Sequence, residues 1–147
     1  MEQSSNKKAG RSRKYTIIIL LILFIIGTVQ ALSGRTGSVI AQVDDNMLGV
    51  VGSYGDPVFV RLDEITRLEL VNAVSFGRCL EGEEKSNTMS GLYENGEFGT
   101  YTLHVYTSSS PYIVIGYGDG NTLIFNQKTA KLTRKIYEDL TTVQARL

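Results

Sequence analysis

The sequence predicts a mainly β domain that ends in one α-helix and follows an N-terminal transmembrane helix. Three observations support this class. Residues 16–32 form an almost uncharged apolar run directly behind a basic tail. Apolar and polar residues then alternate in short segments between residues 39 and 125, a pattern typical of half-buried strands. Beyond residue 126 the apolar residues recur at the spacing of an amphipathic helix.

The tail, residues 1–14, is polar and basic and is predicted to be disordered because it has nothing to bury. Its five basic residues are Lys7, Lys8, Arg11, Arg13 and Lys14. A helix over residues 16–32 would be roughly 25 Å long at about 1.5 Å per residue, near the lower limit for crossing a bilayer. Tyr15 suits the interface with the headgroups. We therefore predict a transmembrane helix, a signal anchor, over residues 15–32.

The distribution of basic residues predicts the orientation of this anchor. Five precede the apolar run, and Arg35 alone lies within the twenty residues that follow it. The basic flank is expected to stay in the cytoplasm, which makes this a single-pass protein of the cell membrane with an extracytoplasmic C-terminal domain. A cleaved signal peptide is the alternative, with a cleavage site at Val29-Gln30-Ala31. A buried core helix is disfavoured, because a run that is apolar on all faces needs a larger protein around it.

Residues 33–38 have the composition of a short flexible linker, and residues 39–147 suffice for one domain with a single core. That domain holds nine Lys and Arg against fourteen Asp and Glu, a formal charge of −5. A negative domain gains no long-range attraction from phosphates, which argues against nucleic acid and anionic lipid as principal partners. Cys79 is the single cysteine, so no disulfide can form within the chain.

Seven strands are expected in the domain. They are residues 39–44, 47–54, 58–62, 66–71, 98–106, 112–116 and 122–125. Turn residues separate most of them, for example Gly55-Asp56-Pro57 and Asp119-Gly120-Asn121. Residues 72–95 contain three glycines and an acidic cluster, and are expected to form a long loop. The connections are too short for helical crossovers, so antiparallel pairing is expected.

The C-terminal helix is predicted from one apolar stripe, Leu132, Ile136, Leu140 and Val143. Asn126 is a candidate N-cap because its side chain can accept hydrogen bonds from the first free amides of the helix, and Thr129 is a later candidate.

Several segments of the second half resemble one family. They are Gly77-Arg78, Gly91–Tyr106, Pro111–Ile115, Leu123–Asn126 and Ile136–Leu140. These segments are similar to the bacterial pleckstrin-homology-like (PH-like) domains of membrane-anchored proteins. The resemblance covers residues 39–140 and implies an antiparallel, strongly bent seven-stranded barrel with one end plugged by the C-terminal helix. It brings no enzyme activity or ligand to named residues. Phosphoinositide binding is not implied, since Asp44 and Asp45 stand where a basic cluster would be needed.

No catalytic, cofactor or metal site is expected. His104, the single histidine, is predicted to be a solvated strand residue, and Cys79 an unpaired loop thiol beside Arg78. The carboxylates between residues 81 and 97 lack the ladder of a calcium loop and are expected to be solvated. Lys128, Lys131 and Lys135 are predicted to line the wet side of the helix, an anionic partner being the alternative.

Most aromatic residues are needed to fill the core, but Tyr93 and Phe98, together with Arg78, are a candidate exposed contact patch, because Tyr and Arg are favoured interface anchors. The sequence thus predicts a non-enzymatic, membrane-anchored interaction or scaffold protein with an envelope protein as its partner. A small-ligand or lipid-headgroup binder near the bilayer is the alternative, and a secreted form after signal-peptide cleavage is the third. The oligomeric state stays open.

Overall fold

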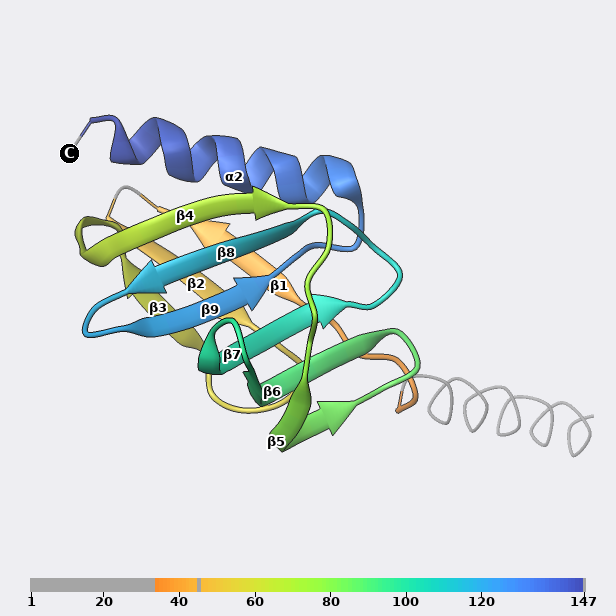
Figure 1. Cartoon of the computed structure of the whole chain (residues 1–147). Coiled ribbons are helices and arrows are strands. Elements are labelled where there is room, and N and C mark those ends of the chain that lie inside the picture. Colours follow the sequence, from red (N-terminus) through yellow and green to blue (C-terminus); the bar gives the residue numbers. More distant parts are fainter. Residues whose placement is uncertain (1–33, 45, 147) are drawn as a thin grey trace, which may run out of the picture. The chain divides into compact units, whose positions relative to one another are not determined.

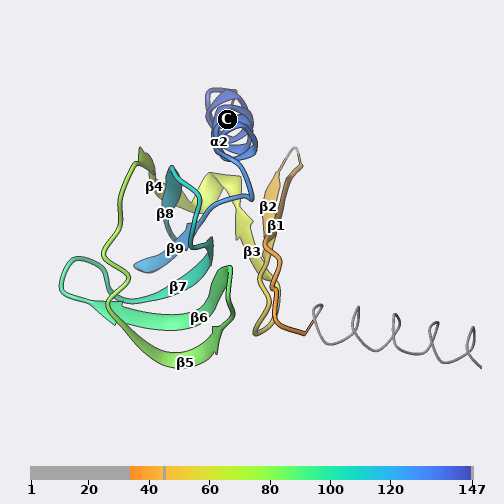
Figure 2. The same cartoon turned by 90° about the vertical axis from the view of Figure 1, so that its right-hand side faces the viewer.

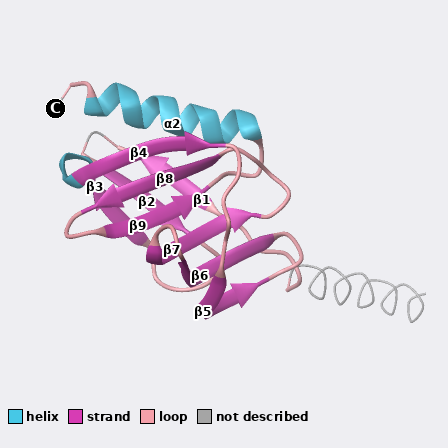
Figure 3. Ribbon diagram, in the orientation of Figure 1, coloured by secondary structure: helices cyan, strands magenta, loops and turns pink. Residues whose placement is uncertain are grey.

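The computed structural model describes residues 34–44 and 46–146 (Figure 1). The predicted basic tail, residues 1–14, and the predicted transmembrane helix, residues 15–32, lie outside the described residues. Within the described ranges, no helix combines the length and the apolar character that a membrane crossing requires. The folded unit begins at Thr36. It is mainly β with one C-terminal helix, as predicted (Figure 3).

The described residues contain nine strands in two sheets. The small sheet has the order β1-β2-β3 and is antiparallel. Its strands are β1 (Ile40–Val43), β2 (Met47–Val51) and β3 (Val58–Arg61). The large sheet has the order β4-β8-β9-β7-β6-β5. Its strands are β4 (Ile65–Val71), β5 (Arg78–Glu84), β6 (Thr88–Asn95), β7 (Gly99–Tyr106), β8 (Tyr112–Tyr117) and β9 (Asn121–Phe125). A 3-10 turn, η1 (Leu62–Glu64), joins the sheets, and helix α2 (Ala130–Gln144) ends the fold.

Strands β5 and β6 occupy the region that the sequence predicts to be a long loop, so that prediction is wrong. The glycines that suggest a loop instead allow two backbones to approach closely. Gly82 and Gly91 are opposite each other in the β5–β6 ladder. A Cβ atom at Gly91 would overlap the Glu81 carbonyl oxygen, and Gly91 has a φ of 142°. Glycine is therefore required here by the close approach of two paired strands, and it does not mark a flexible loop.

The expectation of purely antiparallel pairing is wrong at one place. β9 runs parallel to β7, with Leu103 opposite Ile124. The chain leaves β7, forms β8 beside β4, and returns through a tight turn so that β9 fills the space between β8 and β7. A short hairpin inserted in this way produces a parallel pair without a helical crossover.

The large sheet is buried on both faces at its centre, along β8 and β9. One face packs against the small sheet, with α2 lying along the edge between them (Figure 2). Its core residues include Leu48, Val60, Ile113, Phe125 and Leu140. The opposite face carries a second cluster that the β4–β5 connection covers. Its members are Tyr93, Tyr101, Leu103, Val105, Tyr112, Val114 and Ile124, with Val74 and Phe76 of the connection packed against them.

Helix α2 begins at the later of the two predicted caps. The Thr129 side chain accepts a hydrogen bond from the Leu132 amide at 3.4 Å. Asn126 is instead buried before the helix. Its side-chain oxygen accepts from the Tyr106 amide at 2.7 Å, and its side-chain amide donates to the Ser109 carbonyl at 2.7 Å. Asn126 therefore joins β9 to the end of β7.

The buried side of α2 differs from the predicted stripe at one residue. Leu132 is 48% exposed, whereas Thr133 and Leu140 are fully buried and Ile136 and Val143 are half-buried. The stripe begins with Thr133, whose hydroxyl accepts a hydrogen bond from the Gln127 amide at 2.9 Å. Because the first buried position of the helix is the polar Thr133, the spacing of apolar residues alone does not reveal this register.

The predicted linker, residues 33–38, is fixed to the domain before its end. The Gly37 amide donates to Asn87 Oδ1 at 2.8 Å, and Asn87 Nδ2 donates back to the Gly37 carbonyl at 3.0 Å. The Val39 amide then donates to the Tyr106 hydroxyl at 3.2 Å. These three bonds, which we call the Asn87 clamp, hold the chain against the large sheet before β1 begins.

Candidate functional site

The outer face of the small sheet is exposed and largely apolar, with Gln42 and Arg61 as its polar members. Residues opposite each other in an antiparallel ladder share a face, and the pairs Ile40–Val51, Gly49–Phe59 and Met47–Arg61 all lie on the side away from the core. Ile40 is 61% exposed, Phe59 64%, and Met47 and Val51 41% each. We call these four side chains the β1–β3 apolar face.

This face breaks the usual alternation of a half-buried sheet. The inward residues of β2, Leu48 and Val50, are fully buried, and the outward residues Met47 and Val51 are apolar as well. The Phe59 ring lies against Gly49: a Cβ atom on Gly49 would be only 3.3 Å from the ring. An antiparallel sheet with one solvated face normally presents polar residues on it. The small sheet thus has one apolar and one largely apolar face, and only the first is covered within the described chain.

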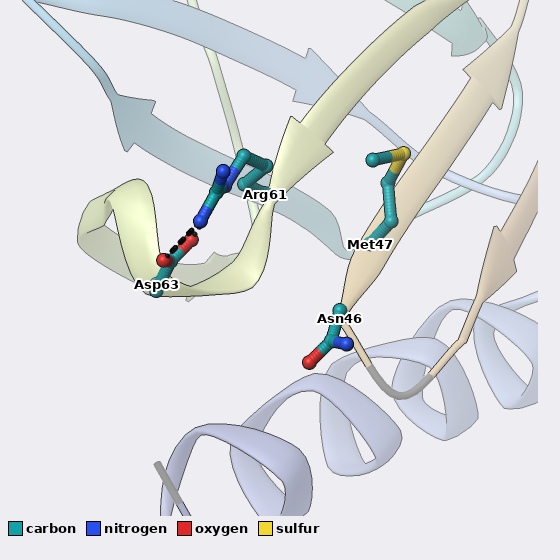
Figure 4. A pocket seen from close by; sticks show the side chains of 4 residues that line it. All are labelled: Asn46, Met47, Arg61 and Asp63. Atoms are coloured by element: carbon teal, nitrogen blue, oxygen red, sulfur yellow. Dashed lines mark hydrogen bonds and ion pairs between the residues drawn. The ribbon is translucent and has the colours of Figure 1, made fainter.

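A cavity of about 340 Å³ adjoins one end of the β1–β3 apolar face. Figure 4 shows its lining side chains, Asn46, Met47, Arg61 and Asp63. The Arg61 guanidinium donates two hydrogen bonds to the Asp63 carboxylate, at 3.0 and 2.6 Å. These bonds hold the pKa of Asp63 below its ordinary value and raise that of Arg61. In this cavity Arg61 and Asp63 thus form an oriented ion pair with little net charge, next to the Met47 side chain.

Tyr93 is not part of an exposed patch. Its side chain is fully buried in the second core cluster, and its hydroxyl donates to Glu84 Oε1 at 3.2 Å. Burial, followed by a hydrogen bond with Cys79, raises the pKa of the Tyr93 phenol. The prediction of surface exposure is wrong because Tyr93 lies on β6, opposite Tyr101 of β7, where alternate residues face inward. The loop predicted over residues 72–95 hides that alternation.

Arg78 and Phe98 serve separate local contacts. Arg78 is exposed, and its Nη2 lies 2.8 Å from Glu94 Oε2. Phe98 is half-buried, makes an edge-on contact with Tyr101 at 5.7 Å between ring centroids, and lies 5.2 Å from the guanidinium carbon of Arg67. With Tyr93 buried, the three residues do not form the continuous contact patch that the sequence suggests.

His104 is buried, contrary to the prediction that it is solvated. Its side chain is 2% exposed, and its Nδ1 lies 3.2 Å from Ser90 Oγ. Burial lowers the pKa of His104 to about 4, so the imidazole is neutral at pH 7. Ser90 is itself fully buried, and its Oγ accepts hydrogen bonds from the Ser53 amide at 3.0 Å and the Ser53 hydroxyl at 3.3 Å. A substrate carbonyl has no approach to this oxygen, so the pair does not act as nucleophile and base.

Other candidate groups are accounted for by local contacts. Glu83 lies 3.4 Å from Lys85, and Glu94 bonds Arg78. Across residues 34–44 and 46–146, no three His, Cys, Asp or Glu side chains come together in a group that could hold a metal ion. Cys79 is half-buried and free, and sits opposite Tyr93 in the β5–β6 ladder.

The outer side of α2 forms a second candidate surface. A groove of about 560 Å³ is lined by Lys131, Leu132, Arg134, Lys135 and Glu138. Lys135 pairs with Asp139 at 2.8 Å, a spacing of one helical turn. This groove combines an exposed leucine with positive charge on a domain whose net charge is negative.

Comparisons with known proteins found no counterpart: neither a protein-family model, nor a curated protein, nor a solved structure matches this chain. The fold and its surface define a β-rich domain with an uncovered apolar sheet face.

Proposed function

We propose that the protein is a non-enzymatic interaction or scaffold protein, anchored in the membrane by residues 15–32 and displaying a PH-like domain outside the cytoplasmic membrane. The observation that carries the proposal is the β1–β3 apolar face. Apolar side chains gathered on one exposed face mark an interaction site. The mainly β fold with its C-terminal helix, and the sequence resemblance, support the PH-like class.

The partner we propose is another envelope protein. Aromatic residues, Met and Arg are enriched at protein interfaces, and Phe59 and Met47 of this face have Arg61 beside them, opposite Met47 in the ladder. Arg61 is already neutralised by Asp63, so the face offers mainly apolar contact. Flat apolar contact of this kind suits a protein surface better than a phosphate-bearing ligand.

The proposal is tested with a photo-crosslinking amino acid at position 59 in cells, and with the same group at exposed position 78 as a control. We expect one envelope-protein adduct from position 59 that position 78 does not give. Substituting Ile40 and Val51 with serine should abolish it, because both lie on the same face as Phe59, with Val51 diagonal to it on β2 and Ile40 opposite Val51 on β1. Equal adducts from both positions, or an adduct that survives the double substitution, would contradict the proposed interface.

The anchor is tested separately. A topology reporter fused after residue 147 is expected to be active only outside the cytoplasmic membrane, and the mature protein is expected to retain residues 15–32. Activity only inside the cell would refute the orientation. A mature N-terminus at Leu32 would replace the anchored form with the secreted one.

A lipid-headgroup or small-ligand binder near the bilayer is the second candidate, favoured by the groove on α2. Lys131, Arg134 and the exposed Leu132 suit an anionic, partly apolar surface. Co-sedimentation with anionic and neutral liposomes distinguishes this function, using Lys131→Glu with Arg134→Glu as the variant. Equal pelleting with both lipids, or no loss in the variant, speaks against it.

A further inference from the structure

Strand β5 is a free edge of the large sheet. It pairs with β6 on one side, and within residues 34–44 and 46–146 no strand pairs with its other side. Figures 1 and 2 show β5 from two directions at the outer end of the sheet, with no other strand beyond it. A free edge presents unpaired backbone groups on which a further strand can form. The β1–β3 apolar face belongs to the other sheet, so this edge is a separate surface.

The turn after β5 determines which of its backbone groups face outward. The Lys85 amide donates to a β6 carbonyl at 2.8 Å, so the backbone of Lys85 faces β6. The direction of the backbone groups alternates along an antiparallel strand, and the ladder is regular from Glu81 onward. The groups of Glu81 and Glu83 therefore also face β6. The amides and carbonyls of Gly82 and Glu84 face outward.

The regular part of β5 is protected by negative charge alone. Edge strands are commonly protected from unwanted pairing by charged side chains, Pro or bulges. A bulge at the start of β5 leaves Leu80 without a partner in the ladder and 41% exposed. Residues 81–84 then form a regular ladder and contain no Pro or Lys. Their three carboxylates repel acidic strands, but they attract a basic one.

A second copy of β5 does not suit this edge. Antiparallel pairing of two β5 strands puts a carboxylate directly opposite another in every register in which Gly82 and Glu84 pair with each other or with themselves. Parallel pairing in register brings the same carboxylates together. Like charges in directly opposite positions destabilise a strand pair. The charges therefore favour a strand from a different protein.

An added strand would meet two kinds of position on β5. On one face, its side chains would lie opposite Glu81 and Glu83. These positions would be non-hydrogen-bonded pairs, in which opposite side chains are closest, so Lys or Arg suits both of them. On the other face, the residue between the two basic ones would lie opposite Gly82, which has no side chain. An aromatic residue can cover a glycine in a neighbouring strand.

We propose that β5 is a docking edge for an extended segment of a partner protein in which two basic residues flank an aromatic one. Backbone hydrogen bonds to Gly82 and Glu84 hold the segment, and Glu81 and Glu83 select its charge. This division of roles is typical of strand addition, in which the main chain supplies affinity and alternate side chains supply specificity. The protein would then bind two partners, one on each sheet.

The probe is a capped peptide, Thr-Thr-Lys-Tyr-Lys-Thr-Thr, which has the same length as β5. Full-length protein is placed in phosphatidylcholine nanodiscs, whose lipid has no net charge to attract the peptide, and hydrogen exchange is followed at single amides by NMR. We expect saturable binding. Exchange at the Gly82 and Glu84 amides should slow by about tenfold at a peptide concentration of ten times the Kd. Exchange at Glu81 and Glu83 should hardly change, because these amides already face β6.

Two controls separate strand pairing from simple attraction of charge. The same peptide with all its backbone amides methylated keeps both lysines but cannot donate to a strand, and we expect it to give no protection. Glu83→Lys places a like charge opposite a lysine and should weaken binding about fivefold. Glu97→Lys makes the same change of charge at an exposed residue outside β5 and should bind as the wild type does. Protection by the methylated peptide, equal weakening by the two variants, slowing at all four amides alike, or no saturable binding would overturn the proposed edge.

Discussion

Leu140 and Leu132 lie two turns apart on α2 and form a matched pair for testing how the helix is held. Leu140 is fully buried in the core between the sheets, whereas Leu132 is 48% exposed. Replacing a buried leucine with alanine costs about 2–5 kcal/mol, because apolar contacts are lost and a cavity is left. The Leu132 side chain is already about half exposed in the folded domain, so the same substitution removes less buried apolar area and should cost under about 1 kcal/mol.

The assay is urea unfolding of the two alanine variants, followed by circular dichroism. Because both changes are Leu to Ala in one helix, differences in intrinsic helix propensity cancel. We expect the Leu140→Ala midpoint to fall well below that of Leu132→Ala with an unchanged m-value, and its melting temperature to fall by at least about 8 °C. Leu132→Asp should also leave the domain folded. Equal losses at the two positions would show that α2 packs through Leu132 and that the helix register described here is wrong.

Three further predictions concern the contacts around the large sheet. His104 has a pKa of about 4 in the folded domain against an ordinary value of 6.5, so the unfolded chain binds a proton first as the pH falls. This preferential protonation of the unfolded chain should remove up to about 3 kcal/mol of stability between pH 6.5 and pH 4. The free energy of unfolding of His104→Asn should therefore depend less steeply on pH over this range. Gly52→Ala should destabilise the domain strongly because its Cβ atom overlaps His104 and Ser90, whereas Gly96→Ala, where no atom lies within 4 Å, should melt as the wild type does. Asn87→Ala should cost about 1–2 kcal/mol and speed hydrogen exchange at the Gly37 amide, and unchanged exchange there would contradict the Asn87 clamp.

The sequence was sufficient to predict the mainly β class, most strand positions and the final helix, because alternation and helical spacing follow directly from burial. It was insufficient at β5 and β6, where glycines allow two paired strands to approach closely and the exposed acidic side chains resemble those of a loop. Tyr93 and His104 were misplaced for related reasons. Tyr93 belongs to a strand that was not recognised. His104 lies on the face opposite Leu103 and Val105, and the β2–β3 connection buries that face as well.

The candidate site could be predicted only in part. Met47, Val51 and Phe59 are visible in the sequence as apolar residues, but an apolar residue in a strand is normally assigned to the core. The exposure of one whole face follows from the three-stranded pairing, which brings Ile40, Val51 and Phe59 together across three segments. The burial of His104 likewise depends on the β2–β3 connection, because Gly52 lies against its ring although the two residues are about fifty positions apart.

The Asn87 clamp determines how the domain responds to tension. A force applied through the N-terminal segment reaches the fold at Gly37 and is borne first by the β5–β6 turn, which carries Asn87, and then by Tyr106 at the end of β7. Strand β1 is thereby shielded from being unzipped from β2 one bond at a time. Tension on the chain before Gly37 would therefore load the large sheet before it loads the small sheet.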